Sequence, residues 1–292
     1  MSASSTSLSQ AEFGSGSLAP SPRPSSGVPG RSGVPTFAIH RSYGCGGAET
    51  CRARDASRAS SRLLPAPGTA SPARPRVDSV TKLEIDRDAA LWSTPEAERA
   101  GRPLLVLLHG KGSHEGDLFG LSPHLPLNVT VASLRAPIAD GPGFSWFARG
   151  GYTPGDVSRE VADAAADAVL AWLDAETDTS AGVGLLGFSQ GAMVSTQLLR
   201  QEPRRFDYAV ALSGYVPREE HDGDARLREL PPPVFWGRGD SDPVIPSASV
   251  EWSIPWLATH TTLTERVYPG LGHGVAPQEL ADISAFIAAR VG

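Results

Sequence analysis

After Thr81 the sequence alternates between short apolar runs and longer amphipathic segments. Pro103–His109 reads P-L-L-V-L-L-H, a nearly continuous apolar run that is typical of a strand buried on both faces. Residues 157–174 instead place apolar side chains three or four positions apart, with acidic side chains between them, which predicts a helix. Strands that alternate with helices in this way favour an α/β fold, with a mainly parallel sheet covered by helices on both faces.

The same alternation continues to the end of the chain. Further strands are expected at Lys82–Ile85, Asn128–Leu134, Val183–Leu186, Tyr208–Leu212, Pro233–Trp236 and Thr264–Tyr268, and further helices at about Gln190–Arg200 and from Pro277 onward. Hydrophobic residues make up 40% of the 292, which is enough for a substantial core. We therefore expect residues 77–292 to form one domain.

Residues 1–76 differ from the rest of the chain in composition. They are rich in Ser, Pro, Gly, Ala and Arg and show no sustained apolar periodicity, so they bury too little surface to offset the entropy of ordering. We expect this segment to be disordered, and three explanations compete for it. It is a tail without a fixed structure, or an organelle transit peptide, because it is rich in Ser and Arg and poor in acids, or a misassigned start, with the true protein beginning near Val77 or Val80. We favour the misassigned start, because the expected order begins so abruptly there.

Charge and cysteine content narrow the class of protein. The net charge is −6, but residues 1–78 carry about +5 and the remainder about −11. An acidic body repels phosphates, so nucleic acid is not an expected partner. No run approaches the roughly 18 apolar residues that cross a membrane, so stable membrane insertion is not expected either. Both cysteines, Cys45 and Cys51, precede the expected domain, which is compatible with the cytoplasm, the location we predict.

The segment Gly187-Phe188-Ser189-Gln190-Gly191 fits the pattern G-x-S-x-G. Alone the pattern is weak, because a chain with 31 glycines yields about a third of a match by chance. Here an apolar strand leads into it and an amphipathic helix follows, which is the strand–turn–helix that carries a nucleophilic serine. Glycines permit close backbone packing around a sharp turn, and the helix N-terminus beneath favours negative charge. We predict that Ser189 is a catalytic nucleophile.

A serine hydroxyl needs a base that accepts its proton at neutral pH. Among the seven histidines, His273 follows the last expected strand in the glycine-rich loop Gly270–Gly274, and it completes the chain order Ser, Asp, His. The acid that orients the imidazole should follow a strand between the serine and the histidine. Asp240 and Asp242 both follow Pro233–Trp236, and spacing does not choose between them.

Two backbone N–H groups are expected to stabilise the negative oxygen that forms during acyl transfer. One belongs to the residue after the nucleophile, Gln190, and the other to the loop after an early strand, where we nominate Lys111. The Gly-Lys-Gly of that loop lacks the Ser or Thr of a phosphate-binding loop. The nearby His114, Glu115 and Asp117 match no metal-ligand spacing. No metal site is therefore expected in this loop.

Four segments together resemble the phospholipase/carboxylesterase family of α/β-hydrolases, which includes bacterial carboxylesterases, lysophospholipases and acyl-protein thioesterases. They are L-L-H-G-K-G-S at Leu107–Ser113, G-F-S-Q-G-A at Gly187–Ala192, G-R-G-D-S-D-P-V-I-P at Gly237–Pro246 and G-L-G-H-G at Gly270–Gly274. In that family the acid is the aspartate before the proline of a D-P-x-x-P run, so the resemblance assigns the acid to Asp242. It covers residues 77–292 and implies an α/β-hydrolase fold with little or no lid and no cofactor.

The resemblance also implies the reaction, which is cleavage of an ester or thioester through an acyl-enzyme. We expect a serine carboxylesterase that acts on short to medium acyl esters. A lysophospholipase or acyl-protein thioesterase is the alternative, and a non-catalytic binding module is less favoured because all three catalytic candidates are present. Residues 143–147 look like the family's aromatic stretch near the acyl pocket, which makes Phe144, Trp146 and Phe147 candidate substrate contacts; plain core packing explains them equally well. The expected partner is a small-molecule ester, and a homodimer would be in keeping with similar proteins.

Overall fold

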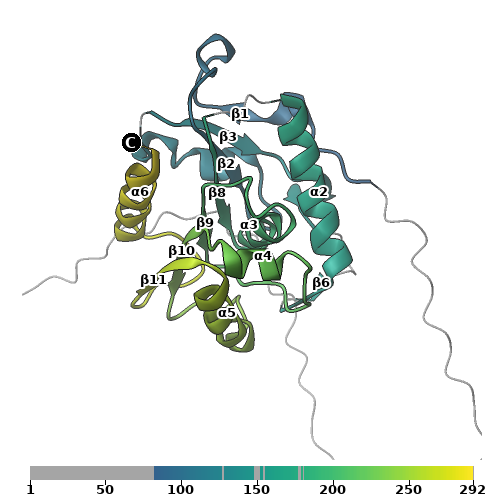
Figure 1. Cartoon of the computed structure of the whole chain (residues 1–292), viewed down its shortest axis with the longest axis vertical. Coiled ribbons are helices and arrows are strands. Elements are labelled where there is room, and N and C mark those ends of the chain that lie inside the picture. Colours follow the sequence, from purple (N-terminus) through teal and green to yellow (C-terminus); the bar gives the residue numbers. More distant parts are fainter. Residues whose placement is uncertain are drawn as a thin grey trace, which may run out of the picture. The chain divides into compact units, whose positions relative to one another are not determined.

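The computed structural model of the chain describes residues 82–126, 128–147, 152, 153, 155–176, 179 and 181–291. Their central element is a seven-stranded sheet in the order β1-β3-β2-β8-β9-β10-β11, in which every neighbouring pair is parallel except β1 and β3 (Figure 1). The strands are β1 Leu91–Trp92, β2 Leu104–Leu108, β3 Thr130–Leu134, β8 Val183–Phe188, β9 Tyr208–Leu212, β10 Pro233–Gly239 and β11 Thr262–Tyr268. The mainly parallel sheet that the sequence predicts is confirmed.

Helices cover both faces of this sheet. One face carries α2 (Arg159–Glu176), α3 (Gln190–Gln201), α4 (Asp224–Glu229) and α5 (Ser247–His260), and the other carries α1 (Glu115–Phe119) and α6 (Pro277–Val291). Figure 1 shows α2 and α6 on opposite sides of the strands. The remaining described elements are the 3-10 turns η1 (Arg87–Ala89), η2 (Glu96–Glu98) and η3 (Ser122–His124) and two hairpins, β4 (Ile138–Asp140) with β5 (Gly143–Ser145) and β6 (Tyr152–Thr153) with β7 (Asp156–Val157).

The middle of the sheet is buried on both faces. Strand β2 reads Leu-Leu-Val-Leu-Leu, and none of its residues is more than 4% exposed. Because successive side chains of a strand point to opposite faces, the first, third and fifth join the core under α2 and α3, and the other two join the core under α6. Burying an aliphatic side chain of this size stabilises a fold by about 1.5–3 kcal/mol. This single strand therefore supports both helical layers.

Several elements differ from the sequence predictions. Lys82–Ile85, predicted as a strand, has no regular secondary structure, and Ile85 is buried against the core without pairing to the sheet. The edge strand is β1 instead, where Trp92 stacks on Trp172 of α2 with ring centroids 5.6 Å apart. The pattern also fails to predict α5, because that helix has no clear apolar stripe and contains Pro255.

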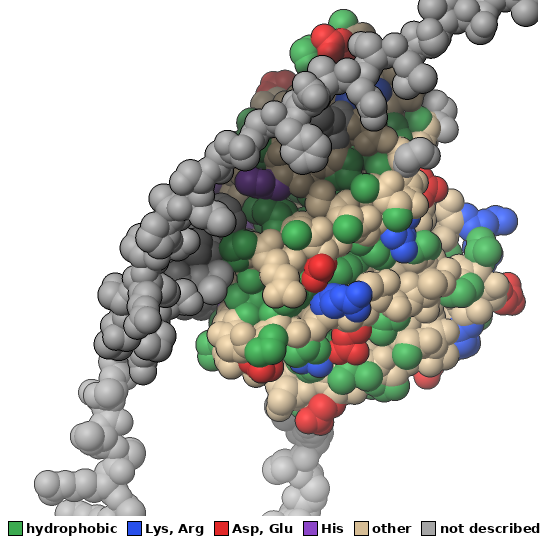
Figure 2. Space-filling model, turned by 90° about the vertical axis from the view of Figure 1, so that its left-hand side faces the viewer, with side chains coloured by type: hydrophobic (Ala, Val, Ile, Leu, Met, Phe, Trp, Pro, Cys, Tyr) green, Lys and Arg blue, Asp and Glu red, His purple; other side chains and the backbone are tan. Residues whose placement is uncertain are grey.

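Among the described residues, no helix combines the length and the apolar character that crossing a bilayer requires. The face shown in Figure 2 mixes acidic, basic and apolar side chains. The expectation that nucleic acid is no partner stays a prediction. The predictions made for residues 1–76 lie outside the described residues.

Candidate active site

The sequence G-F-S-Q-G forms the turn between β8 and α3. Ser189 has φ 53° and ψ −113°, a conformation that residues other than glycine rarely adopt. Close backbone contacts explain the flanking glycines: a Cβ on Gly187 would lie 2.3 Å from Gly191 O, and one on Gly191 would lie 1.9 Å from Leu108 O. The turn therefore presents Ser189 at the carboxyl end of β8, at the N-terminus of α3, where the helix dipole favours negative charge.

His273 lies between Ser189 and Asp242, although the three residues come from distant parts of the chain. Its Nε2 is 3.0 Å from Ser189 Oγ, and its Nδ1 is 2.8 Å from Asp242 Oδ2. The side chains of His273 and Asp242 are only 12% and 8% exposed, and Phe188 packs on the imidazole with ring centroids 4.9 Å apart. With Nδ1–H donating to the carboxylate, Nε2 can accept the proton of the serine hydroxyl.

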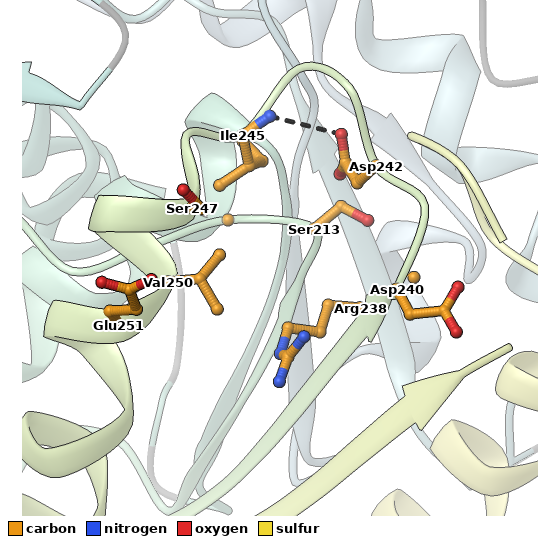
Figure 3. Close-up of a pocket in the computed structure, with 10 residues that line it drawn as sticks. Ser213, Arg238, Asp240, Asp242, Ile245, Ser247, Val250 and Glu251 are labelled. Carbon is orange, nitrogen blue, oxygen red and sulfur yellow. Dashed lines mark hydrogen bonds between the residues drawn. The ribbon is translucent and has the colours of Figure 1, made fainter. Parts of the chain in front are cut away.

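The surroundings of Asp242 favour its ionised form. Burial raises its pKa, but the hydrogen bond and charge of His273 and the N–H groups of Val244 and Ile245 lower it more, so the pKa lies below its ordinary value. Those two N–H groups donate to Oδ1 at 2.8 and 3.2 Å, and Figure 3 shows the second of these bonds. The carboxylate thus has one oxygen for the backbone and one for the imidazole.

Asp240, the other candidate acid, has different partners. Its exposed carboxylate accepts hydrogen bonds from Gly270 N at 2.7 Å and from Ser241 Oγ at 2.8 Å. Figure 3 shows this carboxylate turned away from that of Asp242. The bond to Gly270 links the loop after β10 to the loop after β11, so Asp240 braces the loop that carries His273 without contacting its ring.

The loop after β2 lies beside the serine. A Cβ on Gly110 would be 3.5 Å from Ser189 Cβ and 3.1 Å from the ring of Phe188, so a glycine permits this close approach. Lys111 follows directly, and Gln190 is the first residue of α3. Both predicted oxyanion donors therefore belong to segments that meet at Ser189, and their role stays a prediction.

His109 shapes the same loop. It is fully buried, with Nδ1 2.7 Å from Gly110 O and Nε2 3.1 Å from Ala136 N. Because the backbone N–H of Ala136 is a donor, Nε2 accepts and Nδ1 carries the proton. Burial lowers the pKa of His109 to about 4, although the bond to Gly110 acts in the opposite direction. The ring is therefore a neutral link between the loop after β2 and the end of β3.

Residues 92–291 match the model of the Phospholipase/Carboxylesterase family. The chain belongs to that family. The putative esterase NocK of Nocardia uniformis is 29% identical over 237 residues, which cover 75% of this chain and 66% of that protein. Acyl-protein thioesterase 1 of Cryptococcus neoformans is 30% identical over 123 residues, which cover 35% of this chain and 49% of that protein. The match thus spans about half the length of this thioesterase.

Solved structures agree with this phospholipase/carboxylesterase assignment at the level of the fold. The carboxylesterase of Mesorhizobium loti gives a TM-score of 0.59 at 21% identity, over 71% of this chain and 99% of its own. The carboxylesterase of Bacillus cereus gives 0.58 at 22% identity, over 69% and 93%. The predicted α/β-hydrolase fold is confirmed, and ester hydrolysis is the activity at the level of the family.

In this phospholipase/carboxylesterase chain, the hairpin β4–β5 braces the loop after β2. Gly112 N donates to Phe144 O at 2.8 Å, and Phe144 N donates to Ser113 O at 2.7 Å. A Cβ on Gly143 would lie 2.2 Å from Gly112 O, so the backbones approach too closely for any other residue. Sequence reasoning missed this hairpin, because its strands are three residues long and carry no alternating apolar pattern.

Trp146 connects both predicted oxyanion segments. Its backbone N–H donates to Gln190 Oε1 at 2.7 Å, and its indole N–H donates to His109 O at 2.9 Å. Trp146 and Phe147 are buried in the core, whereas Phe144 is half-buried, and Arg135 lies over its ring. The described contacts of Trp146 therefore hold the backbone of the site, and substrate contact by the three aromatic residues stays a prediction.

A pocket of about 210 Å³ adjoins Asp242 (Figure 3). Ser213 lines it at the end of β9, with φ 44°, and its buried Oγ has no hydrogen-bond partner among the described residues. Within the described part of the chain, Ser189 and Ser213 are the two non-glycine residues in this left-handed region. The sequence carries no signal for Ser213, because a serine at the end of a strand is ordinary.

Proposed function

We propose that this protein is a serine carboxylesterase that hydrolyses short to medium acyl esters through an acyl-enzyme, with Ser189, His273 and Asp242 as its catalytic residues. The observation that carries the proposal is the position of the His273 ring, 3.0 Å from the serine hydroxyl and 2.8 Å from the carboxylate. Membership of the phospholipase/carboxylesterase family supports the class of bond that is broken.

The first half of the reaction forms the acyl-enzyme. Ser189 Oγ attacks the ester carbonyl carbon while His273 Nε2 takes the hydroxyl proton, and the carbonyl oxygen becomes negative. The N–H groups of Lys111 and Gln190 are proposed to donate to that oxygen, each contributing about 3–4 kcal/mol to the stability of the transition state. His273 then gives its proton to the departing alcohol, which leaves as the C–O bond breaks.

The second half repeats the same proton transfers with water. His273 accepts a proton from water, whose oxygen attacks the acyl carbon, and it returns the proton to Ser189 Oγ as the carboxylic acid leaves. Asp242 stabilises the imidazolium that forms in each half. The low pKa of Asp242 supports this role, because a carboxylate that stays charged near neutral pH can pair with the positive ring.

An acyl-protein thioesterase or lysophospholipase is the second candidate. The thioesterase from Cryptococcus neoformans supports it with 30% identity over 35% of this chain. The match to the esterase NocK covers 75% of this chain and so favours the esterase. A thioester would undergo the same steps with a thiol as leaving group. A binding module is the weaker rival, because Ser189, His273 and Asp242 form the hydrogen bonds that catalysis needs. The cytoplasmic location and the homodimer stay predictions.

Two measurements on the full chain test the proposal. A fluorophosphonate probe, which reacts with activated serines, should label Ser189 and should fail to label Ser189→Ala. Steady-state hydrolysis of p-nitrophenyl esters from acetate to palmitate should then give the highest kcat/KM at short or medium length. Highest activity on palmitoyl thioesters would favour the thioesterase instead. A wild-type chain that is folded but neither labelled nor active would rule out both enzymes.

A further inference from the structure

The side chain of Glu279, in α6, is completely buried. It is 0% exposed; Oε2 accepts one long hydrogen bond from Ala276 N, at 3.4 Å, and Oε1 has no partner among the described residues. No Lys, Arg or His of the described segments forms an ion pair with it. The charge of Asp282, on the same helix, raises the pKa of Glu279, and the charge of Glu279 raises the pKa of Tyr268 in β11. A buried carboxyl oxygen without a partner destabilises the folded state. The burial of Oε1 is therefore unfavourable for stability.

The carboxyl group lies between the segments that carry the acid and the imidazole. On one side it meets Gly237 of β10, where an added Cβ would lie 2.2 Å from Oε1. On the other side it contacts Ala276 N, in the segment that runs from His273 into α6. Strand β10 continues into the loop that carries Asp242, so Glu279 lies between the segment that carries Asp242 and the segment that follows His273.

Backbone contacts hold the other end of the same loop. Ser241 N donates to Leu271 O at 3.1 Å, and a Cβ on Gly239 would lie 1.8 Å from Leu271 O. These contacts precede His273 along the chain, whereas Glu279 contacts the chain after it. Contacts with β10 and the loop after it therefore hold the chain on both sides of His273.

We propose that Glu279 is a positioning residue for His273, which holds the segment after the imidazole against β10 and so keeps Nε2 within reach of Ser189 Oγ. The inference rests on the proposed function. A misplacement of about 1 Å in a reacting group can slow a reaction about a hundredfold, so we expect even a small shift of His273 after loss of this contact to lower the rate. Glu279 contacts neither the reacting atoms nor the substrate, so its loss should lower kcat and leave KM unchanged.

Three variants of the full chain test this role. Glu279→Met has a similar volume but cannot accept a hydrogen bond, and removing an unpaired buried carboxyl should leave its melting temperature equal to or above that of the wild type. Glu279→Gln keeps an oxygen that can accept from Ala276 N. Asp282→Ala is the matched control on the same helix, because it loses the hydrogen bond from the Tyr268 hydroxyl at 2.8 Å without touching the histidine segment.

The expected result is a stable Glu279→Met chain whose kcat is lower by about tenfold or more, with KM within about twofold and an equal fall in the rate of fluorophosphonate labelling. Glu279→Gln should recover kcat to within about threefold, and Asp282→Ala should keep kcat while losing stability. If the methionine variant does not fold, Glu279→Ala replaces it.

A folded Glu279→Met or Glu279→Ala chain with unchanged kcat would overturn the inference. So would a kcat for Asp282→Ala that falls as far as that of the Glu279 variant. A wild-type chain that the probe labels separates these results from failure of the proposed function, which would show as a wild-type chain without labelling.

Discussion

Ser189 combines a left-handed backbone with an imidazole at hydrogen-bond distance. Non-glycine residues hold such a conformation at a cost of about 1–3 kcal/mol, and they do so mainly at functional sites. The turn gives the hydroxyl a fixed direction toward His273. Ser213 shares the conformation but has a hydroxyl without a partner among the described residues, which makes it a useful comparison.

Replacing the nucleophile should therefore nearly abolish turnover. We expect Ser189→Ala to lower kcat by about 10⁵–10⁶, because the remaining groups cannot form the acyl-enzyme. Ser213→Ala serves as the control and should change kcat by less than about threefold, since no described contact is lost. Steady-state kinetics with one p-nitrophenyl ester measure both. A fall of less than tenfold in Ser189→Ala would remove that residue from its role.

Neutralising Asp242 and neutralising Asp240 should lower kcat by very different amounts. Asp242→Asn leaves the shape of the side chain intact but offers an amide to His273, so we expect kcat to fall by about 10⁴, as when an acid of this kind is neutralised. Asp240→Asn keeps an oxygen for Gly270 N on an exposed loop, and its kcat should fall by less than about tenfold. The reverse order of effects in the same assay would exchange the two assignments.

Single residues show what the sequence can and cannot predict. The pattern around Ser189 and the order Ser, Asp, His lead to three side chains that hydrogen-bond in the structure. Spacing cannot choose between Asp240 and Asp242, because both sit in one loop and only the path of that loop decides which reaches the ring. Glu279 is not predictable either, since its burial depends on the contact of α6 with β10.

At the scale of elements, the hairpin β4–β5 and the loop after β2 form one unit. Backbone hydrogen bonds join them at Phe144, and Trp146 ties the hairpin to Gln190 and to His109. The hairpin and Trp146, about forty residues before Ser189, therefore hold the two segments that carry the proposed oxyanion donors. On the Lys111 side the contact is the hydrogen bond from Trp146 Nε1 to His109 O.

Trp146→Phe tests this arrangement. The change removes the indole donor and leaves the buried carbonyl of His109 without that bond, which should cost about 1–3 kcal/mol of the free energy of unfolding. If the indole only braces the loop, kcat should fall for esters of every chain length with KM unchanged. A KM that rises only for longer acyl groups would show instead that Trp146 contacts the substrate. Urea unfolding and the ester series provide both readouts.

Regular elements are more predictable than the small ones. The apolar run that forms β2 identifies a central strand because burial on both faces requires it. The hairpin strands are three residues long and carry no alternating apolar pattern, α5 lacks an apolar stripe, and Lys82–Ile85 packs on the core as irregular chain. In each of these cases tertiary contacts, which no local pattern encodes, decide the structure.

At the scale of the whole molecule, Glu279 links stability to pH. Burial raises the pKa of Glu279 from 4.5 to about 7, although the bond from Ala276 opposes the shift. The unfolded chain thus releases this proton at a lower pH than the folded chain. With respect to this group, the folded chain is therefore most stable below about pH 4.5, where the carboxyl is neutral in both states, and it loses stability as the pH rises through about 7.

Glu279→Gln should remove that pH dependence. Relative to the variant, the wild-type free energy of unfolding should fall by an amount on the order of 3 kcal/mol between about pH 4.5 and pH 8. Urea unfolding of both chains across this range measures the difference. A difference that does not change with pH would contradict the raised pKa.

A truncated chain tests whether residues 1–76 contribute to activity or stability. Every core residue of the described structure lies between 85 and 287, and the family match begins at residue 92. We expect a chain that begins at Val77 to keep the kcat of the full chain and to melt within about 2 °C of it, because no described core contact is removed. Aggregation of the shortened chain, or a clear loss of activity, would show that residues 1–76 contribute to the fold.

A ribosome that makes this chain completes β2 and β3 long before β8 exists. Strand β2 pairs with β3 on one side and with β8 on the other, and residues 109–182 separate it from β8, whereas β8, β9, β10 and β11 join the sheet one after another in sequence order. Until β8 emerges, the apolar edge of β2 has no partner, and such an edge is a template for pairing with other chains. Nascent chains that stall before residue 183 are thus the form of this protein most in need of a chaperone.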